Sequence, residues 1–282
     1  MSTTPTRITH LIGGTPWQGS AERTSPVFNP ATGEQTGQLD LASADLVGEV
    51  VTSAKDAWES SWQRASLTQR TQVLFRFREL LNERKGEIAE LITAEHGKVV
   101  SDALGEVTRG LEVAEFACGI PHLLKGGFSE NVSTKVDVYS IRQSLGVVAV
   151  ISPFNFPAMV PLWFVPVAIA CGNAVVIKPS EKDPSAVNAV AALWKEAGLP
   201  DGVLSVVHGD KEAVDALLTH PKVKAVSFVG STPIAKYVYE TGTAHGKRVQ
   251  ALGGAKNHML VLPDADLDLA ADAAVNAGFG PA

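Results

Sequence analysis

The 282-residue sequence predicts an α/β fold, in which an N-terminal helical region precedes a Rossmann-like parallel sheet. Two patterns support this prediction. Apolar residues recur at helical spacing between Ser43 and Gly119, and from Gly146 onward short apolar runs alternate with helical segments. Strands that are apolar at every position are typical of a parallel sheet with helices on both faces.

The first part of the chain predicts three kinds of structure in turn. Residues 1–40 are rich in turn-forming Gly, Pro, Asn and Thr, so we expect irregular structure there. Helices are expected through 43–119, with a boundary at Gly97 and an end before Pro121. Residues 135–142 alternate polar and apolar side chains, which predicts a half-exposed strand at an edge or between subunits.

The second part predicts the sheet and the helices that cover it. Strands are expected at the apolar runs 147–151, 174–177, 203–207, 225–229 and 258–262. Helices are expected between and after them, at 161–170, 184–197, 211–218, 233–239 and 264–279.

Composition excludes several classes of function. The formal net charge is −6 and no basic stripe with interleaved aromatic residues occurs, so nucleic acid is not an expected partner. The polar start lacks the apolar core of a secretory signal, and the apolar run 158–171 is shorter than the roughly 20 residues that span a bilayer. Cys118 and Cys171 form neither a paired framework nor a metal-binding spacing. We therefore expect a cytoplasmic protein with no membrane partner and no metal.

Ligands of parallel sheets bind beyond the carboxyl ends of the strands, which places 152–155, 178–181 and 230–231 on one rim. The sequence has no G-x-G-x-x-G fingerprint. Instead, Gly230 and Ser231 stand at a predicted helix start, where exposed N–H groups and the helix dipole favour a phosphate. The alternative for this turn is an ordinary N-cap.

Three polar side chains on that rim have a chemical interpretation. Lys178 and Glu181 could bind both hydroxyls of an adenosine ribose, and the carboxylate would favour NAD over the phosphorylated NADP. The alternative is a solvated charge pair. Asn155, between two prolines, could donate an amide N–H to an oxygen that becomes negative, or could be a simple turn residue.

In this order and spacing, the segments 153–157 (PFNFP), 178–181 (KPSE) and 250–258 (QALGGAKNH) resemble the aldehyde dehydrogenase superfamily over essentially the whole chain. Phe154, the continuation 159–166 and the segment 250–258 make the chain most similar to the CoA-acylating methylmalonate-semialdehyde dehydrogenases. The resemblance implies an aldehyde-dehydrogenase-like fold with an NAD site, a semialdehyde substrate, coenzyme A as co-substrate and a homo-oligomer at full length.

The resemblance also implies roles for particular residues. Asn155 would stabilise the oxyanion formed when a cysteine thiolate adds to the aldehyde, before hydride passes to NAD. Arg109 would grip the substrate carboxylate; the alternative is an exposed arginine paired with Glu112 or Glu106. The residues implied to line the cofactor site are Ser152, Phe154, Lys178, Glu181, Lys182, Ser231 and Gly253. Family members often carry Arg at position 182, where Lys keeps the charge but loses the planar fork.

Ala251 concerns the step in which the acyl group leaves the cysteine thioester. Hydrolytic family members have a glutamate here that activates water, and its absence should slow thioester hydrolysis by about 10²–10⁴-fold. The CoA thiol would then take the acyl group, and loss of carbon dioxide would give propionyl-CoA or acetyl-CoA. The alternative is a small core residue at 251, with the base of a hydrolytic enzyme elsewhere.

The family continues beyond Gly280 to a catalytic cysteine that this sequence does not reach. Cys118 and Cys171 are expected to be core residues, since nothing nearby would lower a thiol pKa. We therefore expect an N-terminal portion that is inactive alone and lacks the catalytic domain. Alternatives are a non-catalytic NAD-binding or interaction module and a fragment of a hydrolytic enzyme. The expected parts are a helical segment (1–132), an oligomerisation strand (133–145), an NAD-binding domain (146–263) and the start of a catalytic domain (264–282).

Overall fold

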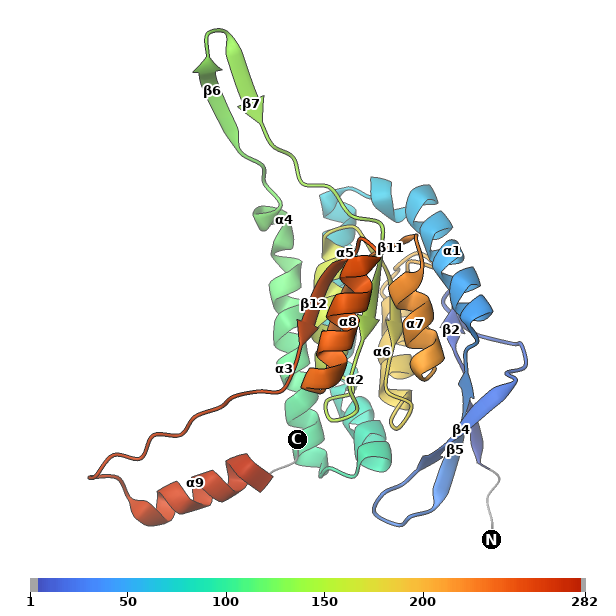
Figure 1. Ribbon diagram of the computed structural model, residues 1–282, viewed down its shortest axis with the longest axis vertical. Helices are drawn as coiled ribbons and strands as arrows, with labels where there is room; N and C mark the ends of the chain where they lie inside the picture. The colour runs from blue at the N-terminus through green and yellow to red at the C-terminus, as the bar shows by residue number, and fades with distance from the viewer. Residues whose placement is uncertain (1–4, 280–282) are drawn as a thin grey trace.

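The computed structural model describes residues 5–279 and shows an α/β body from which two extensions project (Figure 1). Residues 1–4 and 280–282, and with them the expectations about the chain's start and its end, lie outside the described residues. The strand order of the central sheet is β12-β11-β8-β9-β10-β2-β3. Its parallel strands are β8 (Val147–Ile151), β9 (Ala174–Lys178), β10 (Leu204–Val206), β11 (Val223–Val229) and β12 (Arg248–Leu252).

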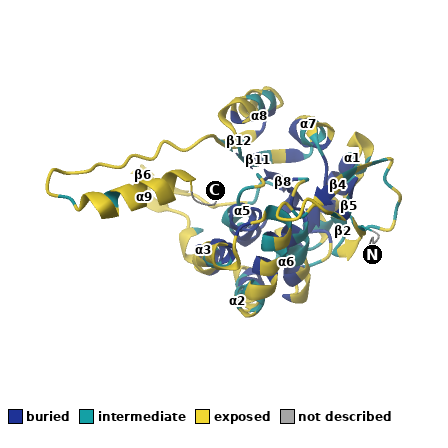
Figure 2. Ribbon diagram, turned by 90° about the horizontal axis from the view of Figure 1, so that it is seen from below, coloured by how far each residue is buried: buried dark blue, intermediate teal, exposed yellow. Residues whose placement is uncertain are grey.

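Helices cover both faces of this sheet, as the buried strands require. One layer holds α1 (Ala44–Ser60), α7 (Lys211–Thr219) and α8 (Thr232–Ala244). The other holds α5 (Met159–Ala170) and α6 (Ser185–Glu196), and outside them lie α2 (Leu67–His96) and α3 (Val100–Cys118). Figure 2, which looks from below, shows these layers with their buried sides toward the sheet. Two short helical turns complete the region, η1 (Trp62–Arg64) and α4 (Ile120–Leu123).

The predicted helices through 43–119 are confirmed, and local sequence explains their ends. Ser66 and Gln69 form a reciprocal capping box at the start of α2. Gly97, with φ of 89°, ends that helix in the left-handed conformation that glycine adopts without strain. The apolar run 158–171 forms the buried helix α5, as expected. Within residues 5–279, every helix is too short or too polar to cross a bilayer.

The prediction of irregular structure for residues 1–40 is wrong. The strands β1 (Thr6–Ile8), β5 (Gln35–Leu41) and β4 (Arg23–Phe28) form a separate sheet in that order, and β2 (Leu11–Ile12) and β3 (Thr15–Pro16) extend the central sheet. Turns do occur at Gly13, Gly14 and Gly33, all with positive φ. Two of the pairings are local, β2 with β3 and β4 with β5, but β1 pairs with β5 and Leu11 of β2 pairs with the distant Val206, so the turn residues alone did not reveal the strands.

Four of the five predicted strands of the sheet are confirmed within a few residues, and one is wrong. Residues 258–262 are exposed and form no strand. The sequence prediction missed β12, which pairs with β11 in parallel from Arg248 opposite Ala225 to Leu252 opposite Val229. As an edge strand, β12 alternates exposed and half-buried side chains, so it lacks the continuous apolar run of the central strands.

Two extensions project from the body. The first is a hairpin of β6 (Phe128–Ser133) and β7 (Val136–Tyr139), in which every residue is exposed. It confirms a strand within 135–142, but that strand is wholly exposed rather than half-exposed, and β6 was not predicted. The second extension runs from Gly253 to α9 (Leu267–Phe279), which has no buried residue. The predicted division between a helical segment (1–132) and an NAD-binding domain (146–263) stays a prediction. The strands β2 and β3, which belong to the first of these parts, form one edge of the sheet in the second.

Candidate cofactor site

A cavity of about 630 Å³ opens at the carboxyl ends of β8, β9 and β11, where the topology rule places a ligand. Its wall contains most of the residues that the sequence predicted for a cofactor: Ser152, Phe154, Lys178, Glu181, Lys182 and Ser231. Gly253 does not line it. Residues that the prediction missed form the opposite side, among them Asp210, Lys211, Val214, Ile234 and Tyr237.

Ser152 follows β8 directly, and its backbone N–H donates to the carbonyl of Lys178 at 3.2 Å. The hydroxyl of Ser152 is buried in the cavity wall and has no hydrogen-bond partner among residues 5–279. A buried hydroxyl without a partner costs stability. It therefore marks a position where a polar ligand group would be bound favourably.

Lys178 ends β9, and its ammonium group is buried rather than solvated. Its Nζ donates to the carbonyl of Gly209 at 2.8 Å and lies 3.5 Å from Oε2 of Glu181. Burial lowers the pKa of Lys178, although the Glu181 charge acts in the opposite direction. The alternative of a solvated charge pair is therefore wrong for Lys178, while the Glu181 side chain stays 41% exposed.

Phe154 is an exposed aromatic residue of the cavity wall, and its ring lies near the side chains of Lys182 and His96. The Nζ of Lys182 lies 4.5 Å from the centroid of the Phe154 ring, and the His96 ring stacks on it at 6.1 Å. A cation over an aromatic face is attracted by the ring quadrupole. Lys182 is thereby held beside the cavity, where its charge can act on an anionic ligand.

Ser231 is the N-cap residue of α8, but its hydroxyl does not cap the helix. Ser231 thus occupies the N-cap position with Pro233 in the first turn, as the N-cap alternative predicted, but the first-turn N–H groups are not satisfied by the Ser231 side chain. Gly253 lies next to Thr232, whose hydroxyl accepts a hydrogen bond from the N–H of Gly254 at 3.2 Å. Gly253 thus supports the start of α8 rather than the cavity wall.

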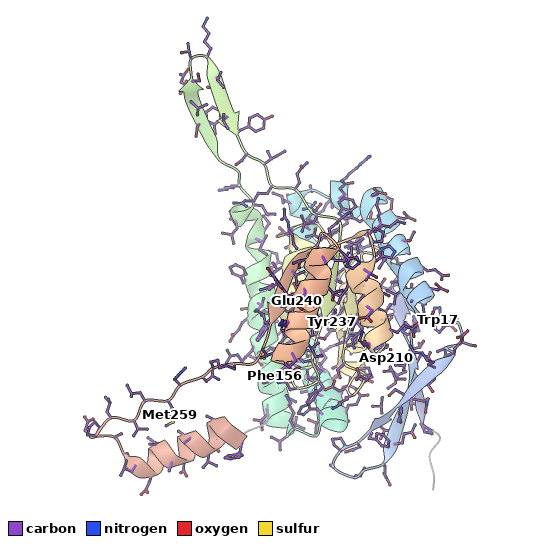
Figure 3. The ribbon with its side chains drawn as sticks, viewed as in Figure 1. Trp17, Phe156, Asp210, Tyr237, Glu240 and Met259 are labelled. Carbon is purple, nitrogen blue, oxygen red and sulfur yellow. The ribbon has the colours of Figure 1, made fainter. Side chains whose placement is uncertain are left out.

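The side of the cavity that the sequence did not predict is formed by residues at the start of α7 and in α8. Asp210 caps α7 and forms an ion pair with Arg23 of β4 at 2.6 Å. The Tyr237 hydroxyl donates to Asp215 at 2.8 Å and accepts from Lys211 at 3.1 Å. Figure 3 shows Asp210 and Tyr237 on the same side of the body. The segment 209–212 comes one residue after the apolar run 203–207. The rule that ligands bind beyond the carboxyl ends of parallel strands could therefore have found Asp210 and Lys211.

Asn155 lies in the turn between β8 and α5, outside the cavity wall. Its backbone carbonyl accepts a hydrogen bond from Nζ of Lys98 at 2.8 Å, and its side-chain amide has no partner among residues 5–279. Arg109 is exposed on α3 and forms no ion pair within the described part of the chain. The predicted alternative pairing is therefore wrong, since Glu106 pairs with Lys98 instead.

Neither Cys118 nor Cys171 lines the cavity. Burial raises the pKa of the Cys118 thiol, whose sulfur lies 3.4 Å from the carbonyl of Ala114. Burial also raises the pKa of Cys171, which is half-buried beside Arg70. Neither is an activated thiol, as the sequence predicted. Residues 5–279 contain no group of three or more side chains arranged to hold a metal ion.

The fold and the rim cavity define an α/β protein with a Rossmann-like parallel sheet, and comparison identifies the family. The sequence pattern of the aldehyde dehydrogenase family matches residues 17–282, so the chain belongs to that family. The family resemblance and the α/β fold class predicted from the sequence are thereby confirmed.

Individual relatives show which members of the family the chain resembles. A malonate-semialdehyde dehydrogenase of Pseudomonas aeruginosa is 53% identical over 96% of this chain and 54% of its own length. The crystal structure of a methylmalonate-semialdehyde dehydrogenase from Oceanimonas doudoroffii has a TM-score of 0.94 and 56% identity, over 98% of this chain and 56% of that one. A structure from Sinorhizobium meliloti 1021 complexed with NAD has a TM-score of 0.95 and 52% identity, over 99% and 56%. The chain spans about half the length of the curated relatives that it matches.

Proposed function

We propose that this chain is the N-terminal, NAD-binding portion of a CoA-acylating malonate- or methylmalonate-semialdehyde dehydrogenase. The observation that carries the proposal is the rim cavity, in which Lys178, Glu181 and the unpartnered Ser152 hydroxyl converge. Relatives that are about half identical to the chain carry these enzyme names, and a similar structure contains NAD.

The cavity residues fit the parts of NAD. Lys178 and Glu181 offer a donor and an acceptor to the two hydroxyls of the adenosine ribose. Glu181 would repel the additional phosphate of NADP, because two negative groups would lie side by side at the ribose. The first-turn N–H groups of α8, beside Ser231, suit the pyrophosphate. When bound, NAD supplies the acceptor for the hydride that leaves the substrate.

The remaining proposed roles belong to the substrate side. Asn155 donates its amide N–H to the oxygen that becomes negative when the aldehyde is attacked. Arg109, exposed on α3, offers a planar fork to the substrate carboxylate. The exposed apolar residues of the β6–β7 hairpin, such as Phe128 and Val138, would pair with another copy in a homo-oligomer.

Ala251 supports acyl transfer to CoA rather than to water. It lies in β12 opposite Phe228, and its methyl group cannot take a proton from water. In the polypeptide that joins this chain to a catalytic cysteine, NADH formation should require CoA. CoA-independent turnover would favour a hydrolytic dehydrogenase instead, and a chain that binds NAD but never enters such a polypeptide would favour the binding module.

Isothermal titration of the chain with NAD and NADP tests the cofactor proposal directly. We expect NAD to bind at least about tenfold more tightly than NADP, and we expect Glu181→Gln to reduce that ratio by weakening the repulsion. Glu196→Gln is the matched control, because Glu196 is similarly exposed but pairs with Arg84 away from the cavity. Absence of NAD binding at millimolar concentration, or an unchanged ratio in Glu181→Gln, would contradict the proposal.

A further inference from the structure

Lys98 and Glu106 form an ion pair that water does not reach. Their charged groups lie 2.8 Å apart, and each side chain is only 1% exposed. Lys98 follows the end of α2 and Glu106 lies in the second turn of α3. Burying two charges is costly unless their remaining hydrogen-bonding groups are also satisfied. The other contacts of this pair therefore indicate what it holds in place.

Those contacts all go to the segment that follows β8. Nζ of Lys98 donates to the backbone carbonyl of Asn155 at 2.8 Å and lies 4.5 Å from the centroid of the Phe156 ring. The second carboxylate oxygen of Glu106 accepts from the N–H groups of Ala158 at 2.8 Å and Met159 at 3.1 Å. These amides lie at the start of α5, where a negative group is favoured by the helix dipole.

One ion pair thus binds the backbone at both ends of the short segment 155–159. The residues just before this segment, Ser152 to Phe154, are in the wall of the cofactor cavity. Asn155, whose amide carries the proposed oxyanion contact, is the residue that Lys98 holds. A change at the pair would therefore reach the cavity through only a few backbone bonds.

We propose that Lys98 and Glu106 are positioning residues, which fix the Asn155 turn and with it the Ser152–Phe154 wall of the cofactor cavity. This inference rests on the proposed function, because the position of the wall affects binding only if the cavity takes NAD.

A second buried carboxyl group, that of Asp183, lies near the Lys98–Glu106 pair but does not replace Glu106 as the partner of Lys98. Asp183 is buried close by, and neither of its carboxylate oxygens has a hydrogen-bond partner among residues 5–279. Burial, together with the nearby charges of Glu95 and Glu106, raises the pKa of Asp183 to about 8. Burial also raises the pKa of Glu95, which binds the N–H and hydroxyl of Ser185. A protonated Asp183 leaves Glu106 as the carboxylate that neutralises Lys98.

The test replaces the pair by apolar residues, Lys98→Met with Glu106→Leu. Removing both charges together avoids an uncompensated buried charge, so the fold should persist. The matched control is Arg78→Met with Glu115→Leu, a solvent-accessible ion pair between α2 and α3. If the apolar pair does not fold, Lys98→Gln with Glu106→Gln keeps polar groups at both positions.

Two measurements decide the outcome: amide hydrogen exchange at Ala158 and Met159, and the dissociation constant for NAD. We expect at least tenfold faster exchange at both amides and roughly tenfold weaker NAD binding, with unchanged exchange in β8 and no effect of the control pair. The Gln pair should lie between the apolar pair and the unmodified chain.

Unchanged exchange at Ala158 and Met159 would overturn the inference, and so would faster exchange with unchanged NAD affinity. If the unmodified chain binds no NAD, the proposed function and the link to the cavity wall both fail. Exchange alone then decides whether the pair fixes the turn: faster exchange supports that role, and unchanged exchange overturns it as well.

Discussion

The central sheet and the two extensions contain the same kinds of local sequence pattern, but only the sheet has other elements packed against it. Every residue of β8 is buried, whereas every residue of β6 and β7 is exposed. The helices differ in the same way, since α5 buries eight of its residues and α9 buries none. An apolar pattern therefore predicts a helix or a strand. The free energy that its burial contributes depends on which other elements of the chain pack against it.

Matched Phe→Ala substitutions should give the largest difference between the two regions. Phe77 is fully buried and stacks on Trp194 at 3.6 Å, so Phe77→Ala should lower the free energy of unfolding by about 4 kcal/mol. Phe128 in the hairpin is 67% exposed, and Phe128→Ala should change it by less than about 0.5 kcal/mol. Urea unfolding followed by tryptophan fluorescence measures both. Equal losses would mean that the hairpin is packed in solution.

Asp183 provides the second test, through pH. Its folded pKa of about 8 exceeds the unfolded value, so only the folded state holds this proton between roughly pH 4 and 8. Stability from this group is therefore present below about pH 4 and is lost as the pH rises through 8. Asp183→Asn should match the unmodified chain at pH 4 and exceed its free energy of unfolding by several kcal/mol at pH 9.

Asp272→Asn is the control for that experiment, because Asp272 lies on the exposed helix α9. It should leave the pH dependence of stability unchanged. Urea midpoints measured from pH 4 to pH 9 distinguish the two variants, and parallel curves for Asp183→Asn and the unmodified chain would contradict a buried, protonated Asp183.

Helix caps give the smallest expected effect. Ser66→Ala breaks the capping box of α2 and should lower the free energy of unfolding by about 1 kcal/mol, because α2 unfolds with the body. Asp266 accepts from the N–H groups of Asp268 and Leu269 at 3.0 Å at the start of α9. Asp266→Ala should reduce helical circular dichroism without moving the thermal midpoint. A shifted midpoint would show that α9 is coupled to the body.

The candidate site was predictable where it depends on position along a strand. Ser152 directly follows the buried strand β8 and Lys178 is the last residue of the buried strand β9, so the rule that ligands bind beyond the carboxyl ends of parallel strands placed both at the cavity. Gly253, which the family resemblance assigned to the cofactor site, follows the edge strand β12 and lies outside the wall of this cavity, so its role there stays a prediction. Tyr237 was missed because it lies inside α8 and reaches the cavity only through the packing of α8 on the sheet.

The sequence by itself determined the buried strands, the helices with their caps, the family and the inert character of both thiols. Each of these depends on residue type and short-range spacing, which the chain carries in any conformation. Only the tertiary structure decided that β2 and β3 extend the sheet, that Arg23 pairs with Asp210, and that Lys98 holds the carbonyl of Asn155. These contacts join residues far apart along the chain, and their formation depends on how the whole body packs rather than on any local pattern.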